Sequence, residues 1–214
     1  MQLMDRVAIV TGAARGLGRA YAEALASEGA AVVAADINDC GETVAGIEAS
    51  GGRAVASTLD VSDSDSCAAM AALAVEAYGR IDILINNAAL YAGLRGARFE
   101  NLDEQQWDQV MQVNIKGTWL TSRAVVGCMR ENGDGGSIIN IASLAAVFGL
   151  PYGLDYVASK AAVIGMTRGM ARELGQDHIR VNAVAPSAVM TEGTAEFFGE
   201  KFEKARTVIA ANQL

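Results

Sequence analysis

The sequence predicts an α/β fold in which helices cover both faces of one doubly wound parallel sheet. Short runs rich in Val, Ile and Ala alternate with longer helical segments, from RVAIV at residues 6–10 to the run at 179–184. Such runs are typical of buried parallel strands joined by crossover helices. Of the 214 residues, 51% are hydrophobic and 20% are charged, which fits one globular domain spanning residues 1–214.

Six runs are predicted as strands from their composition and from the turn residues that bound them. They are 6–10, 31–35, 53–59, 81–85, 137–141 and 179–184. Helices are predicted over 19–27, 62–78, 103–130 and 156–174. The amphipathic segment 191–206 contains Phe197, Phe198 and Phe202, and we expect it to form a lid over a substrate pocket.

Charge and composition exclude several classes of protein. The net charge is −8, which disfavours nonspecific binding to nucleic acid or an anionic membrane, because both need a basic face. The apolar run within MQLMDRVAIV is too short for a signal peptide or a membrane span. Cys40, Cys67 and Cys128 are odd in number and widely spaced, so we expect free thiols and a cytoplasmic location. His178 is the single histidine, so we predict neither a metal site nor a Ser–His–Asp hydrolase.

A glycine-rich turn, TGAARGLG at residues 11–18, follows the first predicted strand. Glycines here allow a tight turn and let backbone N–H groups and a helix N-terminus approach a pyrophosphate. Asp36 ends the second predicted strand, where a carboxylate can accept hydrogen bonds from an adenosine ribose. The unit therefore predicts a bound dinucleotide. The alternative is a tight turn whose glycines serve packing alone.

Three asparagines occupy unusual places. Asn86 and Asn87 follow the fourth predicted strand, and we expect both in the crevice rather than in the core, bonded to a loop or a ligand. An Asx turn that stabilises the loop is the alternative. Asn114 lies in the middle of the predicted helix 103–130, where asparagine is a poor helix former. By itself it indicates a tolerated surface position or a kink.

Tyr156 and Lys160 lie four residues apart, and therefore on one face of the last predicted long helix. A phenol titrates near pH ~10, and a neighbouring ammonium lowers that pKa. Ser143 lies upstream, and its hydroxyl could hold a carbonyl or alcohol oxygen against the phenol. The three residues predict a general acid–base site for C–OH/C=O chemistry. Taken alone, such a pair is ordinarily a packing tyrosine and a surface lysine.

Together these motifs resemble those of the short-chain dehydrogenase/reductase family of the classical type. The matching segments are the glycine turn, Asp36, Asp60-Val61, Asn86–Ala89, Asn114, Ser143 and Tyr156-x-x-x-Lys160. The resemblance implies a Rossmann-like fold and an oxidoreductase that acts on CH–OH groups. Ala89 and Ser187 replace glycines of the family pattern. The family continues past the position of Leu214 through a helix and a final strand, so we expect that strand to be absent from the sheet.

The resemblance implies a role for each matching residue. Tyr156 is the acid–base, Lys160 lowers its pKa and contacts the nicotinamide ribose, and Ser143 holds the substrate oxygen. Asn114 holds a water that links Lys160 to solvent as a proton relay. The residues expected around the cofactor are Gly12, Arg15, Gly16 and Leu17 at the phosphates and adenosine ribose, Asp36 and Ile37 beside that ribose, Asp60 and Val61 at the adenine, Asn87 in the cleft, and Val189 and Thr191 at the carboxamide.

Cofactor choice depends on opposing charges at the adenosine ribose. Asp36 favours NAD over NADP, because a carboxylate beside a dianionic 2′-phosphate costs Coulomb energy, and Ile37 supplies no further guanidinium. Arg15 argues the other way, since a basic residue in the glycine turn often accompanies NADP in relatives. We weigh the carboxylate more heavily and expect NAD.

We therefore expect an NAD-dependent enzyme that interconverts a secondary alcohol or sugar hydroxyl and a ketone. Its expected partner is a small, moderately apolar substrate, and the resemblance implies a homo-oligomer, either a dimer or a tetramer. The expected pocket residues are Leu144, Ala145, Tyr152, Ser187, Phe197 and Phe198. Two alternatives stay open: an NADPH-dependent 3-oxoacyl reductase, and a dinucleotide-binding protein without catalysis.

Overall fold

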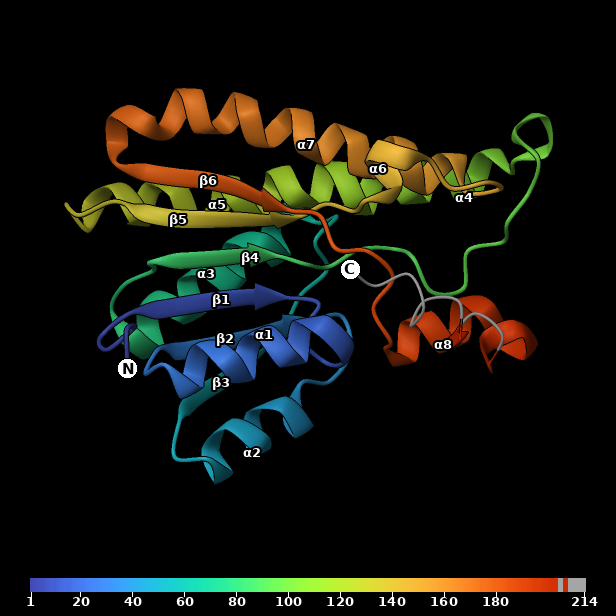
Figure 1. Cartoon of the computed structure of the whole chain (residues 1–214). Helices are drawn as coiled ribbons and strands as arrows, with labels where there is room; N and C mark the ends of the chain where they lie inside the picture. Colours follow the sequence, from blue (N-terminus) through green and yellow to red (C-terminus); the bar gives the residue numbers. More distant parts are fainter. Residues whose placement is uncertain (204–205, 208–214) are drawn as a thin grey trace.

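A computed structural model of the chain describes residues 1–203 and 206–207 (Figure 1). The strands are β1 (Val7–Thr11), β2 (Ala31–Asp36), β3 (Arg53–Thr58), β4 (Ile83–Asn86), β5 (Gly136–Ile141) and β6 (Ile179–Val184). They form one sheet in the order β3-β2-β1-β4-β5-β6, and every neighbouring pair is parallel. The predicted doubly wound parallel sheet is confirmed.

The strand order reverses direction at β1. The chain runs outward from β1 through β2 to β3, and then returns to place β4 on the other side of β1. Val10 pairs with Ala34 of β2 and with Ile85 of β4. In open α/β sheets the crevice at such a reversal, beyond the carboxyl ends of the strands, is where ligands bind. The topology therefore marks the carboxyl ends of β1 and β4 as the place to look for a site.

Helices cover the two faces of the sheet in separate groups. They are α1 (Gly16–Ser27), α2 (Gly41–Ala49), α3 (Ser64–Tyr78), α4 (Glu104–Val110), α5 (Thr118–Glu131), α6 (Ala145–Phe148), α7 (Leu154–Leu174) and α8 (Glu192–Phe198). Figure 1 shows α1 and α2 on one side of the sheet and α3 and α5 on the other. Ala8 and Val10 pack with the first group, whereas Ile9 packs with the second. Successive strand residues point to opposite faces, so β1 is buried on both.

The predicted helix 103–130 contains a change of helical type. Asp103 begins it as an N-cap that accepts a hydrogen bond from the backbone N–H of Gln106 at 3.1 Å. A π-helical segment, Met111–Gly117, separates α4 from α5. Asn114 lies within that segment and is only 1% exposed. The expectation of a surface position is therefore wrong, and a break in the regular helix, of the kind that π-helical turns provide, is what the structure contains.

The segment after β6 turns toward the start of α1. Thr191 caps α8 by accepting a hydrogen bond from the N–H of Thr194 at 3.2 Å. A 3-10 turn, Gly199–Lys201, follows the helix. Of the predicted lid 191–206, residues 204–205 lie outside the described residues, and so do the side chains of Phe197 and Phe198. Figure 1 shows α8 beyond the carboxyl ends of the strands, the position that a lid requires.

The remaining expectations concern the sheet edge, the thiols and the histidine. In the described part of the chain β5 is the only strand that pairs with β6. Cys40, Cys67 and Cys128 are free, as predicted. His178 is exposed at the start of β6. Among the described helices, none has the length and apolar character needed to cross a bilayer.

Candidate active site

An elongated cleft lies at the carboxyl ends of the strands. Its larger part, about 600 Å³, is bounded by the glycine turn, by Ser143, Tyr156 and Lys160, and by residues 186–194. A second part, about 310 Å³, extends toward the ends of β2 and β3. Arg15 and Asn87 line both parts, so the two volumes are continuous at the glycine turn.

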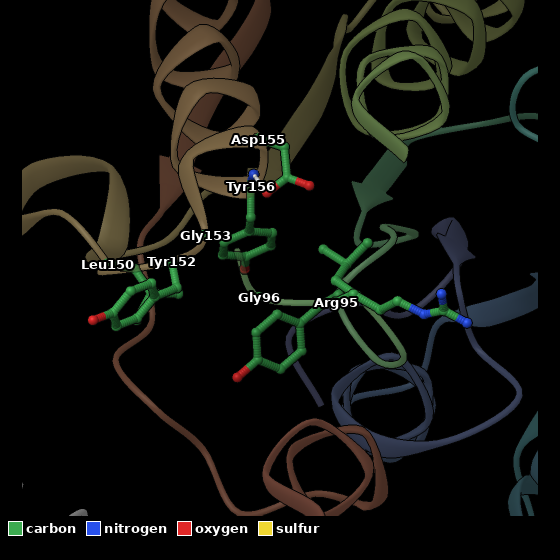
Figure 2. Close-up of a pocket in the computed structure, with 9 residues that line it drawn as sticks. Arg95, Gly96, Leu150, Tyr152, Gly153, Asp155 and Tyr156 are labelled. Atoms are coloured by element: carbon green, nitrogen blue, oxygen red, sulfur yellow. Dashed lines mark hydrogen bonds between the residues drawn. The ribbon is translucent and has the colours of Figure 1, made fainter. Parts of the chain in front are cut away.

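The cleft brings together nearly all of the predicted site residues. Those lining the larger part are Arg15, Gly16, Leu17, Asn87, Ser143, Leu144, Ala145, Tyr156, Lys160, Ser187, Val189 and Thr191. Those lining the smaller part include Gly12, Asp36, Ile37, Asp60 and Val61. Asn114 is not among the lining residues. Tyr152 lines a separate small recess beside Tyr156, which Figure 2 shows in close-up.

The glycine turn is fastened to the loop that follows β4. The Asn87 side-chain amide donates to the carbonyl oxygens of Thr11 and Gly12 at 3.0 and 3.1 Å. Gly12 has a φ of +68°, and a Cβ on it would lie 2.8 Å from Asn87 Nδ2. A Cβ on Gly18 would lie 1.9 Å from the carbonyl oxygen of Gly12, so only glycine lets α1 start this close to β1. Gly12 lines the smaller part of the cleft, and Gly16 and Gly18 line the larger part.

Two carboxylates mark the ends of β2 and β3. Asp36 accepts hydrogen bonds from the N–H of Ala14 at 3.0 Å, from the N–H of Asn38 at 2.9 Å and from the Asn38 amide at 3.1 Å. An ionised carboxylate has about four acceptor positions, so one stays open to a ribose hydroxyl. Asp60 accepts from the N–H and hydroxyl of Ser62 at 2.8 and 2.7 Å, and so fixes its own turn.

Lys160 lies beneath the cleft rather than on the protein surface. Its side chain is 4% exposed, and its Nζ donates to the carbonyl oxygen of Ile141, the last residue of β5, at 2.7 Å. Burial lowers the pKa of Lys160 to about 8. The distance from Nζ to the centre of the Tyr156 ring is 5.8 Å. The lysine is therefore held against the phenol side chain, with its ammonium bonded to the sheet.

Burial raises the pKa of the Tyr156 phenol, and a hydrogen bond with the Ser143 side chain acts against that increase. The Lys160 ammonium is bonded to Ile141, and burial lowers its own pKa. The lowering of the Tyr156 pKa that we expected from Lys160 stays a prediction. Ser143 is in turn oriented by the N–H of Ala145, which donates to its Oγ at 3.1 Å.

Asn114 holds two elements together beside the cleft. Its amide oxygen accepts from the N–H of Leu90 at 2.7 Å, and its amide nitrogen donates to the Leu90 carbonyl at 3.2 Å and to Ser159 Oγ at 3.0 Å. These contacts fix the loop after β4 against α7 at Ser159, which is the residue before Lys160. Both amide hydrogens and one lone pair of the amide oxygen are thus engaged by protein atoms, and the predicted water relay stays a prediction.

Asn86 belongs to the core rather than to the crevice, so our expectation for it is wrong. It is 5% exposed, and its amide donates to Ser122 Oγ and to Asn140 Oδ1, both at 2.9 Å. Thr121 donates to Asn86 Oδ1 at 2.6 Å, and Asn140 donates to Thr167 at 2.9 Å. This buried network joins β4 and β5 to α5 and α7, directly beneath the cleft.

Sequence reasoning missed three residues around Tyr156. The Tyr91 ring lies with its centre 5.1 Å from that of Tyr156, and burial raises the pKa of Tyr91 to about 12. Asp155 is 1% exposed and accepts from the N–H of Tyr156 at 2.8 Å and from the Gln106 amide at 2.7 Å. Gln106 also bonds the backbone of Arg95 in both directions. Asp155 and Tyr156 lie side by side in Figure 2, while the Arg95 guanidinium points away from the phenol.

Comparison with known proteins agrees with this geometry. The family model described as short chain dehydrogenase matches residues 6–201. An uncharacterized NAD-dependent oxidoreductase of Mycobacterium tuberculosis is 41% identical over 204 residues, which cover 88% of this chain and 73% of that protein. The 3-oxoacyl-[acyl-carrier-protein] reductase FabG of Thermotoga maritima is 40% identical over 196 residues, covering 91% and 78%.

Solved structures share the same fold. The crystal structure of carveol dehydrogenase from Mycobacterium avium, in complex with NAD, matches with a TM-score of 0.83 and 34% identity. The match covers 86% of this chain and 71% of that one. Sequence, fold and site geometry therefore agree. They set aside the alternative of a dinucleotide-binding protein without catalysis. The chain belongs to the classical short-chain dehydrogenase/reductase family and is an oxidoreductase acting on CH–OH groups.

Proposed function

We propose that the protein oxidises a small, uncharged secondary alcohol to its ketone, or catalyses the reverse reduction, with NAD as the cofactor. The observation that carries this proposal is the pair of hydroxyl side chains, Ser143 and Tyr156, which line the cleft together with the buried Lys160. Two hydroxyls can receive one substrate oxygen between them, and one of them, a phenol, can transfer the proton.

The residues present fit a nicotinamide dinucleotide. The closely packed glycine turn at the start of α1 suits a pyrophosphate, and Asp36 and Asp60 end adjacent strands at the smaller part of the cleft. When bound there, the cofactor supplies or accepts the hydride. The proposed contacts are those given above for Gly12, Arg15, Gly16, Leu17, Asp36, Ile37, Asp60, Val61, Asn87, Val189 and Thr191.

The proton steps are assigned to this chain's own residues. In reduction Tyr156 donates its phenol proton to the substrate oxygen, and burial favours the protonated phenol that this step needs. In oxidation Tyr156 accepts the alcohol proton, and Ser143 stabilises the phenolate. Lys160 is proposed to reach the nicotinamide ribose from its position on Ile141. Asn114 is proposed to keep α7 in register, with the water relay as a further prediction.

The lining of the larger part of the cleft favours an uncharged substrate. Among its lining residues the charged side chains are Arg15 and Lys160, and each already has a protein partner. The apolar side chains around them include Leu144, Phe148 and Leu150. A carboxylate or phosphate on the substrate would find no unengaged cation there. The match to carveol dehydrogenase supports a compact apolar alcohol.

A second candidate is an NADPH-dependent 3-oxoacyl reductase. Arg15 favours it, because its guanidinium lines the part of the cleft that contains Asp36, and the Thermotoga maritima relative bears that activity in its name. Asp36 disfavours it through repulsion of a 2′-phosphate. The predicted homo-oligomer and cytoplasmic location stay predictions.

Turnover assays with the two cofactors in parallel test the proposal. We expect nicotinamide reduction when NAD is offered with cyclic or branched secondary alcohols, and a smaller kcat/KM with NADP. A preference for NADPH with a 3-oxoacyl thioester would favour the second candidate. Dinucleotide binding without turnover of any alcohol, ketone or thioester would contradict both.

A further inference from the structure

An ion pair connects the glycine turn to the lid across 181 positions of sequence. The two terminal nitrogens of Arg15 each donate to a different oxygen of Glu196 on α8, and the Nη2–Oε2 distance is 3.0 Å. This is the bidentate geometry in which a guanidinium binds a carboxylate most strongly. Arg15 is 47% exposed and Glu196 is 48% exposed, so the pair lies open to solvent at the mouth of the cleft.

The start of α8 lies against the turn next to this pair. A Cβ on Gly16 would lie 3.5 Å from Thr191 Cβ and 3.7 Å from a Glu192 carboxylate oxygen. Thr194, one turn into the helix, is 4% exposed and donates to the Val189 carbonyl at 2.5 Å. Packing and the helix cap therefore hold the start of α8 against the turn that carries Arg15.

Arg15 is the one cation available to the adenosine end of the cleft. The described residues that line this part include two acids, Asp36 and Asp60, and no lysine or arginine other than Arg15. The next arginine, Arg19, is already engaged by Glu42 at 2.9 Å and by the Ala14 carbonyl at 2.6 Å. A 2′-phosphate dianion beside Asp36 would need a guanidinium, and Arg15 is the candidate.

We propose that Glu196 is a cofactor-specificity residue, which acts by holding Arg15 in a bidentate ion pair and so withholding the guanidinium from a 2′-phosphate. The inference rests on the proposed NAD preference and deepens it. Asp36 repels the phosphate directly, whereas Glu196 occupies the group that would offset this repulsion. The lid segment would thus help to select the cofactor as well as to cover the substrate.

The test is the ratio of dissociation constants for NADPH and NADH, measured by calorimetry on the full chain. Glu196→Gln keeps the size of the side chain and removes its charge. We expect this variant to bind NADPH more tightly by about twofold to fivefold, the range of a half-exposed charge pair, with little change for NADH. Glu200→Gln is the matched control, because it removes the same charge from an exposed position just beyond α8.

Arg15 variants make the test specific. In an Arg15→Gln background, Glu196→Gln should no longer increase the affinity for NADPH relative to NADH, since no guanidinium is left to release. An increase in relative NADPH affinity that persists in the Arg15→Gln background, or an equal increase in Glu200→Gln, would overturn the inference in favour of a general charge effect. A loosened α8 would shift both dissociation constants together and leave their ratio unchanged.

The outcomes also separate this inference from the proposed function. Wild-type protein that binds neither NADH nor NADPH would overturn the proposed function, and the inference with it. Wild-type protein that prefers NADH, together with an unchanged ratio in Glu196→Gln, would overturn the inference alone and leave the NAD preference to Asp36.

Discussion

Lys160 donates its ammonium to the carbonyl oxygen of Ile141 at 2.7 Å, and this bond ties the middle of the site to the end of β5. The lysine is buried against the phenol side chain of Tyr156, and burial raises the pKa of that phenol. The hydroxyl of Ser143 is the group that favours the phenolate. Lysine and serine thus have separate tasks, and the separation leads to different predictions for each.

Substitution of Lys160 should change how stability depends on pH. Burial lowers the pKa of Lys160 from 10.5 to about 8, so between these values the unfolded chain holds a proton that the folded chain lacks. The free energy of unfolding of the wild type therefore rises with pH across that window. Below the window, the buried ammonium of Lys160 destabilises the fold by its full desolvation cost, about 3 kcal/mol. Lys160→Met carries no such penalty. In urea unfolding, the free energy of unfolding of Lys160→Met minus that of the wild type should fall between about pH 8 and pH 10.5. A constant difference would contradict the assignment.

Removal of the Ser143 hydroxyl should move the pH profile of oxidation. Ser143→Ala deletes the hydrogen bond that opposes the burial of the phenol, so the pKa of Tyr156 should rise further. The rising limb of kcat for oxidation, along which Tyr156 loses its proton, should shift to higher pH, and kcat near neutrality should fall by about 10²-fold. Ser143→Thr keeps the hydroxyl and should restore much of the loss. An unshifted profile in Ser143→Ala would show that the serine does not contact the reacting phenol.

Alanine at Gly18 should prevent correct formation of the glycine turn. Its Cβ would lie 1.9 Å from the Gly12 carbonyl oxygen, which has no room to move because Asn87 bonds to it. We expect a loss of several kcal/mol or failure to fold, together with loss of NADH binding. Gly127→Ala is the control, since a Cβ there meets nothing within 4 Å on α5, and this variant should gain about 0.5–1 kcal/mol. Equal melting temperatures for the two variants would contradict the packing described.

An ion cluster at the opposite end of the sheet should govern acid stability. Asp82 accepts from Arg6 at 2.7 Å and from Arg80 at 2.6 and 2.8 Å, and from the N–H of Val7 at 2.9 Å. Burial acts to raise the pKa of Asp82, but the hydrogen bonds outweigh it and the pKa is lowered from 3.8.

This stabilisation is therefore present above about pH 4 and is lost as the pH falls through the lowered pKa. Asp82→Asn should cost about 1–2 kcal/mol near neutrality, because it removes the buried carboxylate that Arg6 and Arg80 share and leaves both with the exposed Asp134. The difference from wild type should narrow at acidic pH. A cost that is the same at pH 7 and pH 3 in denaturant melts would show that the carboxylate charge is not what stabilises this end.

Much of the fold follows from local patterns in the sequence. The predicted strand 179–184 has the same bounds in the structure, because alternating Val and Ile runs flanked by turns are a local signal. Other elements are less visible. The helices α2 and α6 were not predicted, since α2 contains two glycines and α6 is only four residues long. The π-helical segment around Asn114 depends on bonds to Leu90 and Ser159, which are distant in sequence.

The candidate site, like the fold, could be predicted from the sequence only in part. Spacing places Tyr156 and Lys160 on one helical face, but it cannot show that the ammonium reaches Ile141 instead of the phenol. The position of Asn86 at a strand end is local information, whereas its burial depends on side chains from α5 and β5. Glu196 lies 181 positions from Arg15, and only the folded chain brings the two together.

The measurement that tests the central claim most directly is turnover by Tyr156→Phe, compared with wild type and with NADH binding measured on the same preparation. The account predicts loss of kcat by at least about 10²-fold, with NADH affinity nearly unchanged because the aromatic ring stays in place. Tyr78→Phe, at the end of α3 and outside the lining of the cleft, is the control and should keep wild-type turnover. Wild-type turnover by Tyr156→Phe would contradict the assignment of the acid–base and the mechanism built on it.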